Sequence, residues 1–227
     1  MIFAIVATAR SPASITTAGI KSTWWLPDSL DPNGAAQLLC AGITTFNSLR
    51  HSGAVPGDVV AVLGVGGLGH LGIQFASRSG FKVVAIGRGP ETAALARKLR
   101  ASSYIDGNAV NAAAELQKLG GARVILATAP SAKAMTDLIP GLAPNGKLLV
   151  IGATAESLAV PPIALIMGSL SVSGWYSGTA ADSEDTLRFA ELSGVRPMIE
   201  TFPLDKAAEA YARMKSGRAE FRVVLTM

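Results

Sequence analysis

The sequence predicts an α/β fold, a doubly wound parallel sheet that extends from about Val59 to about Ser193. Short apolar runs rich in β-branched residues recur in this region, and stretches of helical pattern separate them. The runs are continuous rather than alternating, which is typical of strands that are covered on both faces. Strands separated by helices indicate right-handed β-α-β crossovers and therefore a parallel sheet.

Six strands and the helices between them follow from this pattern. We expect strands at Asp58–Leu63, Lys82–Ile86, Ser103–Ile105, Ala122–Ala127, Lys147–Ile151 and Leu170–Ser173. We expect helices at Leu68–Gly80, Glu91–Arg100, Ala109–Leu119 and Ser131–Ile139. Ser131 can cap the last of these. A further helix precedes the sheet at Ala35–Leu49, and Asp31 or Asn33 is its expected cap.

The two ends of the chain do not continue this alternation. Residues 1–23 have no clear period, although Ile2–Ala7 is apolar and could form a first strand or a frayed terminus. After Gly194 we expect a strand, a helix and a closing strand, at Met198–Phe202, Leu204–Lys215 and Phe221–Leu225. These elements come in addition to the six strands of the sheet, so we expect a remnant of a second, mainly β domain at the termini. The expected segments are 1–34, irregular; 35–193, a Rossmann-like domain; and 194–227, which closes onto the second domain.

Composition and charge exclude several classes of protein. Hydrophobic residues make up 49% of the 227 positions and charged residues 16%, which favours a packed core over long disordered arms. The net charge of +4 is spread along helical patterns rather than gathered in blocks, so nucleic acid is not an expected partner. No run of about 18 to 20 apolar residues occurs, so no membrane span is expected. A single cysteine excludes an internal disulfide framework and fits a reducing, cytoplasmic location.

A glycine-rich elbow lies between the first strand of the sheet and the helix that follows it. The segment reads Gly64-Val-Gly66-Gly67-Leu68-Gly69. Three glycines at such a junction allow a tight turn, close approach of a diphosphate to backbone N–H groups, and close packing of helix against strand. The bare N–H groups and the positive dipole end of the helix then favour an anion. The elbow predicts that the chain binds a dinucleotide, with Gly66, Gly67 and Leu68 as backbone donors.

The end of the second strand indicates which nicotinamide coenzyme fits. An NAD site needs a carboxylate about 20 residues beyond the glycines, to accept hydrogen bonds from the ribose hydroxyls. This strand ends instead in Ile86-Gly87-Arg88. Gly87 leaves room for a 2′-phosphate, and Arg88 could pair with that phosphate through two N–H groups. We therefore expect NADP, with NAD as the alternative. The other interpretation of Arg88 is an exposed charge that precedes a helix.

Three motifs occur in the order found in one enzyme family. The segment Leu-Leu-Cys40-Ala-Gly-Ile-Thr44 precedes the elbow at a matching spacing, the elbow continues to His70, and Arg222-Val-Val-Leu lies near the C-terminus. Together they resemble the zinc-dependent alcohol dehydrogenases of the medium-chain dehydrogenase/reductase family. The resemblance covers about Trp25 to Met227. Members of that family have an N-terminal catalytic domain and a C-terminal coenzyme domain, so this chain looks like the C-terminal two-thirds of such a dehydrogenase.

The resemblance also implies roles for single residues. It matches Cys40 to a ligand of the catalytic zinc, Thr44 to a residue that touches the nicotinamide, and Arg222 to an arginine that reaches the diphosphate. Ile151 and Gly152, in Val150–Ala153, and the segment Gly174–Ser177 match segments that line the nicotinamide and the dimer edge. Cys40 is the one cysteine of the chain, and the upstream Gly-His-Glu segment of the family does not occur. Cys40 is thus the single remaining ligand, and we do not expect this chain to hold a tight zinc by itself.

The resemblance implies hydride transfer between a small alcohol or aldehyde and a nicotinamide coenzyme. Two alternatives stay open. One is a non-catalytic dinucleotide-binding module. The other is a zinc-free quinone or enone reductase, against which Cys40 argues because that branch needs no ligand there. The sixth strand and its following turn could pair edge to edge in a homodimer.

Other conspicuous residues have simpler interpretations. His51 follows an apolar helix, where it would stabilise the C-terminal end of the dipole. His70 could approach a phosphate, and a packing role is the alternative. The carboxylates at 182–185 would form the cap and first turn of a helix. Trp24 and Trp25 are expected to be hydrophobic anchors.

Overall fold

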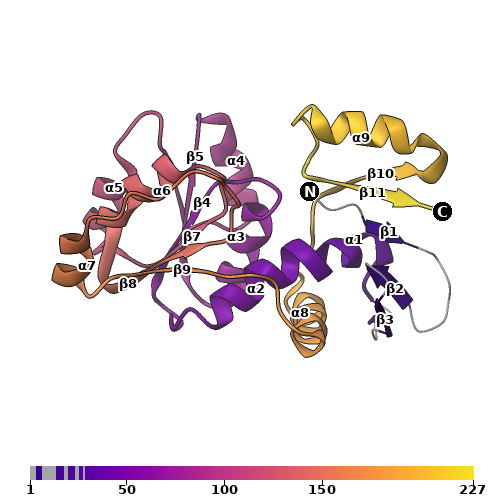
Figure 1. Ribbon diagram of the computed structural model, residues 1–227, viewed down its shortest axis with the longest axis horizontal. Helices are drawn as coiled ribbons and strands as arrows, with labels where there is room; N and C mark the ends of the chain where they lie inside the picture. The colour runs from indigo at the N-terminus through magenta and orange to yellow at the C-terminus, as the bar shows by residue number, and fades with distance from the viewer. Residues whose placement is uncertain (1–3, 7–13, 18–19, 24–25, 28) are drawn as a thin grey trace. The chain divides into compact units, whose positions relative to one another are not determined.

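The computed structural model describes residues 4–6, 14–17, 20–23, 26–27 and 29–227. The chain forms two compact units (Figure 1). The sheet unit contains residues 44–176, and the terminal unit combines residues 1–43 with residues 177–227. The domain limits expected at residues 34 and 193 stay a prediction. Trp24 and Trp25 lie outside the described residues.

The sheet unit is built on six parallel strands. They are β4 (Val59–Leu63), β5 (Lys82–Gly87), β6 (Ser103–Asp106), β7 (Ala122–Ala127), β8 (Leu142–Val150) and β9 (Ser171–Gly174). Their spatial order is β6-β5-β4-β7-β8-β9, which is the order 3-2-1-4-5-6 of a Rossmann fold. The expected fold class is confirmed. The order reverses between β4 and β7, and ligands of such folds bind beyond the carboxyl ends of the strands at this point.

One helix, α2 (Ile43–Arg50), comes before β4, and the other helices connect the successive strands. These are α3 (Gly69–Arg78), α4 (Glu91–Lys98), α5 (Ala112–Lys118), α6 (Ala132–Leu138) with the short 3-10 turn η2 (Ile139–Gly141), and α7 (Pro162–Gly168). The side chain of Asn111 caps α5, and that of Ser131 caps α6 as the sequence predicts.

The centre of the sheet is fully buried. Ala61, Val84 and Ile125 lie on three neighbouring strands, and each is 0% exposed. They belong to one core cluster with Leu116 of α5 and Leu148 of β8. Helices cover both faces of such a sheet, which explains why its strands appear in the sequence as continuous apolar runs.

The largest differences from the expected elements occur at β8 and α7. β8 begins at Leu142, whereas the sequence predicts a start at Lys147. The prediction starts too late because Asn145, a residue typical of turns, lies within the strand with a φ of +58°. The pairing of β8 with β7 shifts its register at this point. Helix α7 was not expected at all. None of its residues is buried, and Met167 is 79% exposed, so no amphipathic period marks it in the sequence.

The terminal unit contains two small sheets. In one, β11 (Arg222–Thr226) pairs in parallel with β10 (Ile199–Pro203) and with β1 (Ala4–Val6). The 3-10 turn η3 (Leu204–Lys206) and helix α9 (Ala207–Lys215) connect β10 to β11. The other sheet is the antiparallel hairpin of β2 (Ser14–Thr17) and β3 (Ile20–Thr23). The additional β structure expected at the termini is confirmed.

The helix expected at residues 35–49 is interrupted by a wider turn. Helix α1 (Pro32–Gln37) leads into the π-helical turn η1 (Leu38–Gly42), which leads into α2. Asp31 caps α1, since its carboxylate accepts hydrogen bonds from the N–H groups of Asn33 and Gly34. A Cβ on Gly42 would lie 3.0 Å from the Leu38 side chain, so glycine allows the turn to pack tightly.

Helix α8 (Ala180–Ser193) begins with a capping box. Thr179 accepts a hydrogen bond from the N–H of Asp182, and the Asp182 carboxylate accepts one from the N–H of Thr179. The carboxylates at 182–185 therefore belong to a helix start, as expected. Within the described ranges, no helix combines the length and the apolar character that crossing a bilayer requires.

Candidate functional site

The glycine elbow has a backbone that only glycine accommodates. Gly64 follows β4 with a φ of +94°, in the left-handed region that favours glycine. Its N–H donates to the carbonyl of Ile86 at 2.8 Å, which ties the turn to β5. A Cβ on Gly69 would overlap the carbonyl oxygen of Gly64, so the first turn of α3 lies directly against the end of β4. These contacts are the tight turn and the close helix–strand packing that the sequence predicts.

The start of α3 presents N–H groups that the helix itself does not use. The helix's own bonds begin where the N–H groups of His70 and Gly72 donate to the carbonyls of Gly66 and Leu68, both at 2.9 Å. The N–H groups of Gly66, Gly67, Leu68 and Gly69 come before these bonds and donate to no carbonyl of the described residues. A Cβ on Gly66 would meet no atom within 4 Å, so the elbow is open at this residue. The elbow thus has the shape and the donors that a diphosphate requires.

His70 holds the elbow from inside. Its imidazole is 0% exposed, and Nδ1 lies 3.0 Å from the Gly66 carbonyl oxygen, which also accepts the His70 backbone N–H. Because a carbonyl can only accept, Nδ1 carries the proton in this bond. The structure therefore places His70 in packing and in support of the turn, and its ring is not exposed toward an anion.

The space beside Gly87 differs from the sequence interpretation. A Cβ at this position would lie 2.7 Å from the hydroxyl of Tyr104 on the neighbouring strand β6. The Tyr104 hydroxyl donates to the Gly89 carbonyl at 2.7 Å. Glycine at the end of β5 thus accommodates Tyr104, and the room that we assigned to a 2′-phosphate is filled by this ring. Burial raises the pKa of Tyr104, with Asp106 and Glu91 adding to the effect, so the hydroxyl keeps its proton.

Arg88 is an exposed side chain on a turn that other residues hold. Its carbonyl accepts a hydrogen bond from Thr92 Oγ1 at 3.1 Å, and Asp106 Oδ1 accepts the N–H of Gly89 at 2.9 Å. Arg88 forms no ion pair with any of the described residues. Its guanidinium can therefore pair with an added anion.

Sequence reasoning missed Tyr104 and Asp106. Asp106 is the register partner of Gly87 across the β5–β6 pair, and its carboxylate lies beside the turn that carries Arg88. The missing signal is the alignment of strand ends, because the residues that follow adjacent parallel strands meet at one edge of the sheet.

A cavity of about 560 Å³ lies beyond the carboxyl ends of β8 and β9. It is lined by Met135, Val150, Ile151, Gly152, Ala153, Thr154, Glu156, Leu158, Gly174, Trp175 and Tyr176. Ile151 and Gly152, which the resemblance matches to the nicotinamide, both belong to this lining. A planar, mostly apolar ring with one amide group fits such a lining.

Thr128 connects this cavity to the elbow. Its hydroxyl donates to the Leu63 carbonyl at 2.7 Å and lies 3.0 Å from the Cβ position of Gly64. A Cβ on Gly152 would lie 2.6 Å from the Thr128 carbonyl oxygen. The elbow and the cavity therefore lie next to each other on the carboxyl edge of the sheet, as one extended ligand would require.

Cys40, Thr44 and Arg222 lie in three different elements. Cys40 is half-buried in the π-helical turn η1, and Thr44 is half-buried at the start of α2. Arg222 is half-buried at the start of β11, and its Nε is buried without a hydrogen-bond partner among the described residues. Cys40 and Arg222 belong to the terminal unit and the elbow to the sheet unit, so their expected roles stay predictions.

The residues that the structure describes do not supply a zinc site. In this part of the chain, no three or more histidine, cysteine, aspartate or glutamate side chains are grouped so that they could hold a metal ion. A catalytic zinc takes three protein ligands and a structural zinc four. Cys40 by itself does not meet either requirement.

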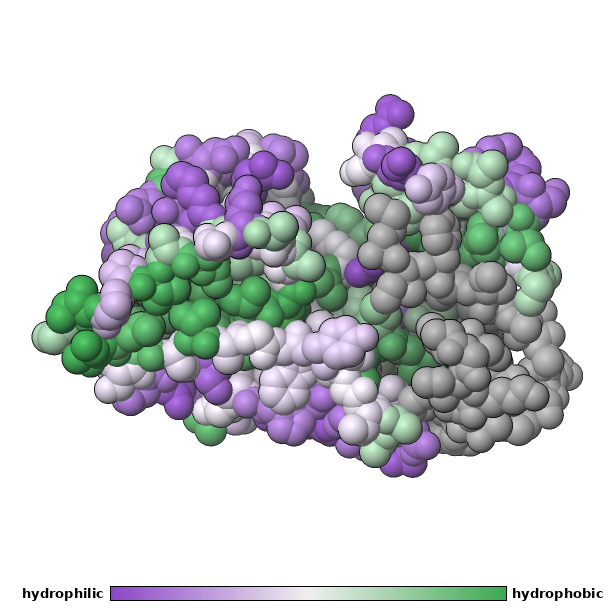
Figure 2. Space-filling view, in the orientation of Figure 1, coloured by the Kyte–Doolittle hydropathy of each residue, from purple (hydrophilic) through white to green (hydrophobic). Residues whose placement is uncertain are grey.

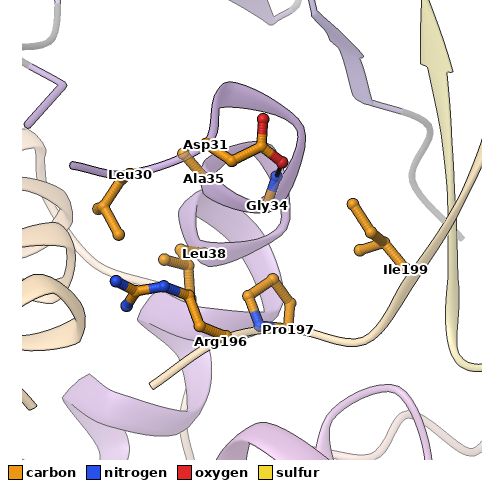
Figure 3. Close-up of a pocket in the computed structure, with 8 residues that line it drawn as sticks. All are labelled: Leu30, Asp31, Gly34, Ala35, Leu38, Arg196, Pro197 and Ile199. Atoms are coloured by element: carbon orange, nitrogen blue, oxygen red, sulfur yellow. Dashed lines mark hydrogen bonds between the residues drawn. The ribbon is translucent and has the colours of Figure 1, made fainter. Parts of the chain in front are cut away.

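A smaller cavity of about 150 Å³ lies in the terminal unit, between α1 and the segment that follows α8 (Figure 3). Its lining includes two charged residues, which both have partners in the protein. Asp31 caps α1, and the Arg196 guanidinium donates to the carbonyls of Ala190 and Val195 at 2.8 and 2.9 Å. None of the sequence-predicted site residues lines this cavity.

Similar proteins are found by sequence. The family profile described as zinc-binding dehydrogenase matches residues 67–192, which is more than half of the chain. Alcohol dehydrogenase notN of Aspergillus sp. is 44% identical over 215 residues, which cover 95% of this chain and 63% of that protein. An alcohol dehydrogenase of Geobacillus stearothermophilus is 36% identical over 203 residues, which cover 89% of this chain and 60% of that protein.

Solved structures give the same result. A cinnamyl alcohol dehydrogenase from Sorghum bicolor superposes with a TM-score of 0.77 at 31% identity, over 89% of this chain and 57% of that one. The chain spans about 60% of the length of the curated relatives that it matches. With the strand order and the glycine elbow, the family match shows that the chain belongs to the zinc-binding dehydrogenase family.

Proposed function

We propose that this chain binds NADP(H) along the carboxyl edge of its parallel sheet and acts in hydride transfer between an alcohol or aldehyde and the nicotinamide. The observation that carries the proposal is the elbow, where Gly64 and Gly69 bring bare helix N–H groups next to open space. The family supports an oxidoreductase. Since the chain spans about 60% of its relatives, the activity of the whole protein is part of the proposal.

Each part of the coenzyme has candidate partners in this chain. The N–H groups of Gly66, Gly67 and Leu68 would hold the diphosphate. Ile151 and Gly152 would line the nicotinamide within the larger cavity. The bound nicotinamide supplies the hydride chemistry, and the protein orients it and excludes water. The apolar residues around Ile151 suit that task because they offer a water molecule few hydrogen-bond partners.

NADP is preferred to NAD in this proposal because of charge. Arg88 is exposed, and no described residue pairs with its guanidinium, so a 2′-phosphate would gain a partner. The nearby Asp106 would oppose a 2′-phosphate, but its Oδ1 already accepts the N–H groups of Gly89 and Asn108. The filled space beside Gly87 means that the preference rests on the Arg88 side chain alone.

Calorimetric titration with NADPH and NADH tests this preference. We expect tighter binding of NADPH by about tenfold, the effect of one charge-assisted pair worth ~1.4 kcal/mol. The Arg88→Asp variant should reverse the preference, while Arg97→Asp, a change of the same charge on the next helix, should leave it unchanged. Equal affinity for the two coenzymes in the wild-type chain would reject the role given to Arg88.

The described residues support no catalytic step through zinc, so the proposal contains none. Cys40 would be one ligand of a set whose other members these residues do not provide. This observation favours a second candidate function, a dinucleotide-binding module without catalysis of its own. Zinc content and NADPH oxidation, measured together on the purified chain, separate the two. Coenzyme binding with little zinc and no aldehyde reduction indicates the module. Aldehyde reduction with stoichiometric zinc that Cys40→Ala removes indicates a dehydrogenase.

We further propose that the chain forms a homodimer through the edge strand β9. One edge of β9 has no neighbouring strand in the described sheet, and Ile166 and Met167 of α7 are 72% and 79% exposed. Figure 2 shows hydrophobic surface at the end of the sheet unit that carries α7. No charged residue occurs between Glu156 and Asp182, so this edge lacks the charged side chains that usually prevent an edge strand from pairing with another chain. A second copy related by a two-fold axis would cover it.

A further inference from the structure

Trp175 forms part of the wall of the larger cavity. It follows β9 directly, its N–H donates to the Val150 carbonyl at 3.2 Å, and its side chain is half-buried. The same wall contains Ile151 and Gly152. The next residue, Tyr176, is 95% exposed, so the chain leaves the sheet immediately after Trp175. The position of the indole therefore helps to define how wide the cavity is at this end.

His51 stacks on this indole from a distant part of the sequence. The two ring centroids lie 5.0 Å apart, and the ring planes are inclined by only 15°. His51 follows the last residue of α2, so the stack joins the C-terminal end of this helix to the segment after β9. Two flat rings in this arrangement restrict each other's rotation.

The end of α2 fixes the His51 ring. Nδ1 lies 2.9 Å from the Asn47 carbonyl oxygen, which also accepts the backbone N–H of His51 at 3.1 Å. This carbonyl belongs to the last turn of the helix and accepts both N–H groups of His51. Because the carbonyl only accepts, Nδ1 carries the proton and the plane of the imidazole is set by the helix.

We propose that His51 is a positioning residue for the nicotinamide end of the coenzyme, which it affects through Trp175. The chain of contacts runs from the Asn47 carbonyl to the imidazole, from the imidazole to the indole, and from the indole to the cavity. The inference rests on the proposed coenzyme function. It predicts that loss of the stack weakens binding of the nicotinamide and leaves binding of the diphosphate at the elbow unchanged.

Calorimetry with two ligands tests this inference on the full chain. NADPH occupies the elbow and the cavity, whereas 2′-phospho-ADP-ribose lacks the nicotinamide ring. We expect His51→Ala to raise the Kd of NADPH about 3- to 10-fold, the range that a lost ring pair gives, and to leave the Kd of the fragment unchanged. His51→Phe keeps a flat ring but lacks the hydrogen bond to Asn47, so it should restore NADPH binding in part. Arg50→Ala, at the adjacent position, is the control and should change neither Kd.

Four outcomes of these titrations would contradict the inference. NADPH binding by His51→Ala at wild-type affinity would show that the stack does not matter. An equal loss for both ligands would show a general structural role. A Kd of NADPH for His51→Phe as weak as that for His51→Ala would exclude the ring stack as the cause. A wild-type chain that binds neither ligand would refute the proposed coenzyme function itself, which distinguishes this failure from the first three.

Discussion

At the scale of single residues, the glycines of the elbow have different tasks. Gly64 is required by its backbone angle, and Gly69 by its contact with the Gly64 carbonyl oxygen. Gly66 has neither constraint, since a Cβ there would point into open space. The first two glycines therefore serve the fold. The third keeps clear the place where a diphosphate would approach the backbone.

This division predicts opposite effects of two alanine substitutions. Gly69→Ala should reduce the free energy of unfolding by about 3 kcal/mol or more, because a new Cβ cannot be placed beside the Gly64 carbonyl without moving the helix. Gly66→Ala should change stability by less than about 0.5 kcal/mol and raise the Kd of NADPH about tenfold. Urea unfolding and calorimetry measure both. A stable Gly69→Ala variant, or Gly66→Ala with unchanged coenzyme affinity, would contradict this assignment.

The residues of the elbow could be predicted from the sequence because glycine has few reasons to recur at such spacing. The reason given for Gly87 was wrong in one respect. We assigned the absent side chain to a ligand, and the structure assigns it to Tyr104 of the neighbouring strand. A contact between residues on adjacent strands depends on register, and register is not visible in one segment of sequence.

At the scale of elements, one ion pair joins strand β10 to helix α9. Arg213 Nε and Nη2 donate to the two carboxylate oxygens of Glu200 at 2.8 and 2.9 Å, and the N–H of Glu220 donates to Oε1 at 2.9 Å. These hydrogen bonds favour the charged form, Arg213 most strongly, and lower the pKa of Glu200 from 4.5 to about 2. The bidentate geometry makes this pair stronger than an ordinary surface contact.

The lowered pKa predicts how the stability of the terminal unit depends on pH. Since the folded pKa lies below the unfolded value, the pair stabilises the protein above pH 4.5, and this contribution is lost as pH falls toward about 2. At pH 7, Glu200→Gln should reduce the free energy of unfolding by about 1 kcal/mol, allowing for partial exposure. Urea unfolding at several pH values should show the difference shrink in acid.

Glu209→Gln provides a matched control on α9, the helix that carries Arg213. Glu209 lies 3.7 Å from Lys206, and both side chains are more than half exposed. We expect this variant to change stability by less than about 0.5 kcal/mol at every pH. An equal loss for Glu200→Gln and Glu209→Gln, or a Glu200 effect that persists at pH 2, would contradict the role of the ion pair.

Strands and helices could be predicted where an element has one consistent period. The strands β4, β5 and β7 were found because burial on both faces leaves continuous apolar runs. Helix α7 is not predicted, because three of its apolar residues, Ile163, Ile166 and Met167, are exposed and none of its residues is buried. The start of β8 was misplaced because a residue typical of turns, Asn145, lies inside the strand.

At the scale of the whole molecule, the parallel sheet determines where chemistry can occur. The strand order brings the elbow after β4 and the cavity after β8 and β9 to the same carboxyl edge. The sequence could predict this edge and several residues on it. The family resemblance matches the segments that contain Ile151 and Trp175 to the nicotinamide, but the residue pattern alone could not predict the cavity. The two segments become neighbours only when β8 and β9 pair in register.

Assembly is the second property at this scale. If two copies pair through β9 and α7, replacement of Ile166 and Met167 by glutamate should weaken the dimer at least tenfold. The interface would then have to bury two charged carboxylates in place of two apolar side chains. Sedimentation over a range of concentrations measures this shift. Leu192→Glu is the control, since this residue of α8 is 87% exposed but lies in the terminal unit. A wild-type chain that stays monomeric throughout would contradict the pairing.

Nuclear magnetic resonance of the backbone amides gives the most direct test of the coenzyme site. In a ¹⁵N-labelled chain titrated to saturation with NADPH, we predict the largest amide shifts at Gly66, Gly67 and Leu68. Smaller shifts should follow at Ile151 and Gly152. Amides of the elbow that stay unmoved at saturating coenzyme would contradict the central claim that this turn holds the diphosphate.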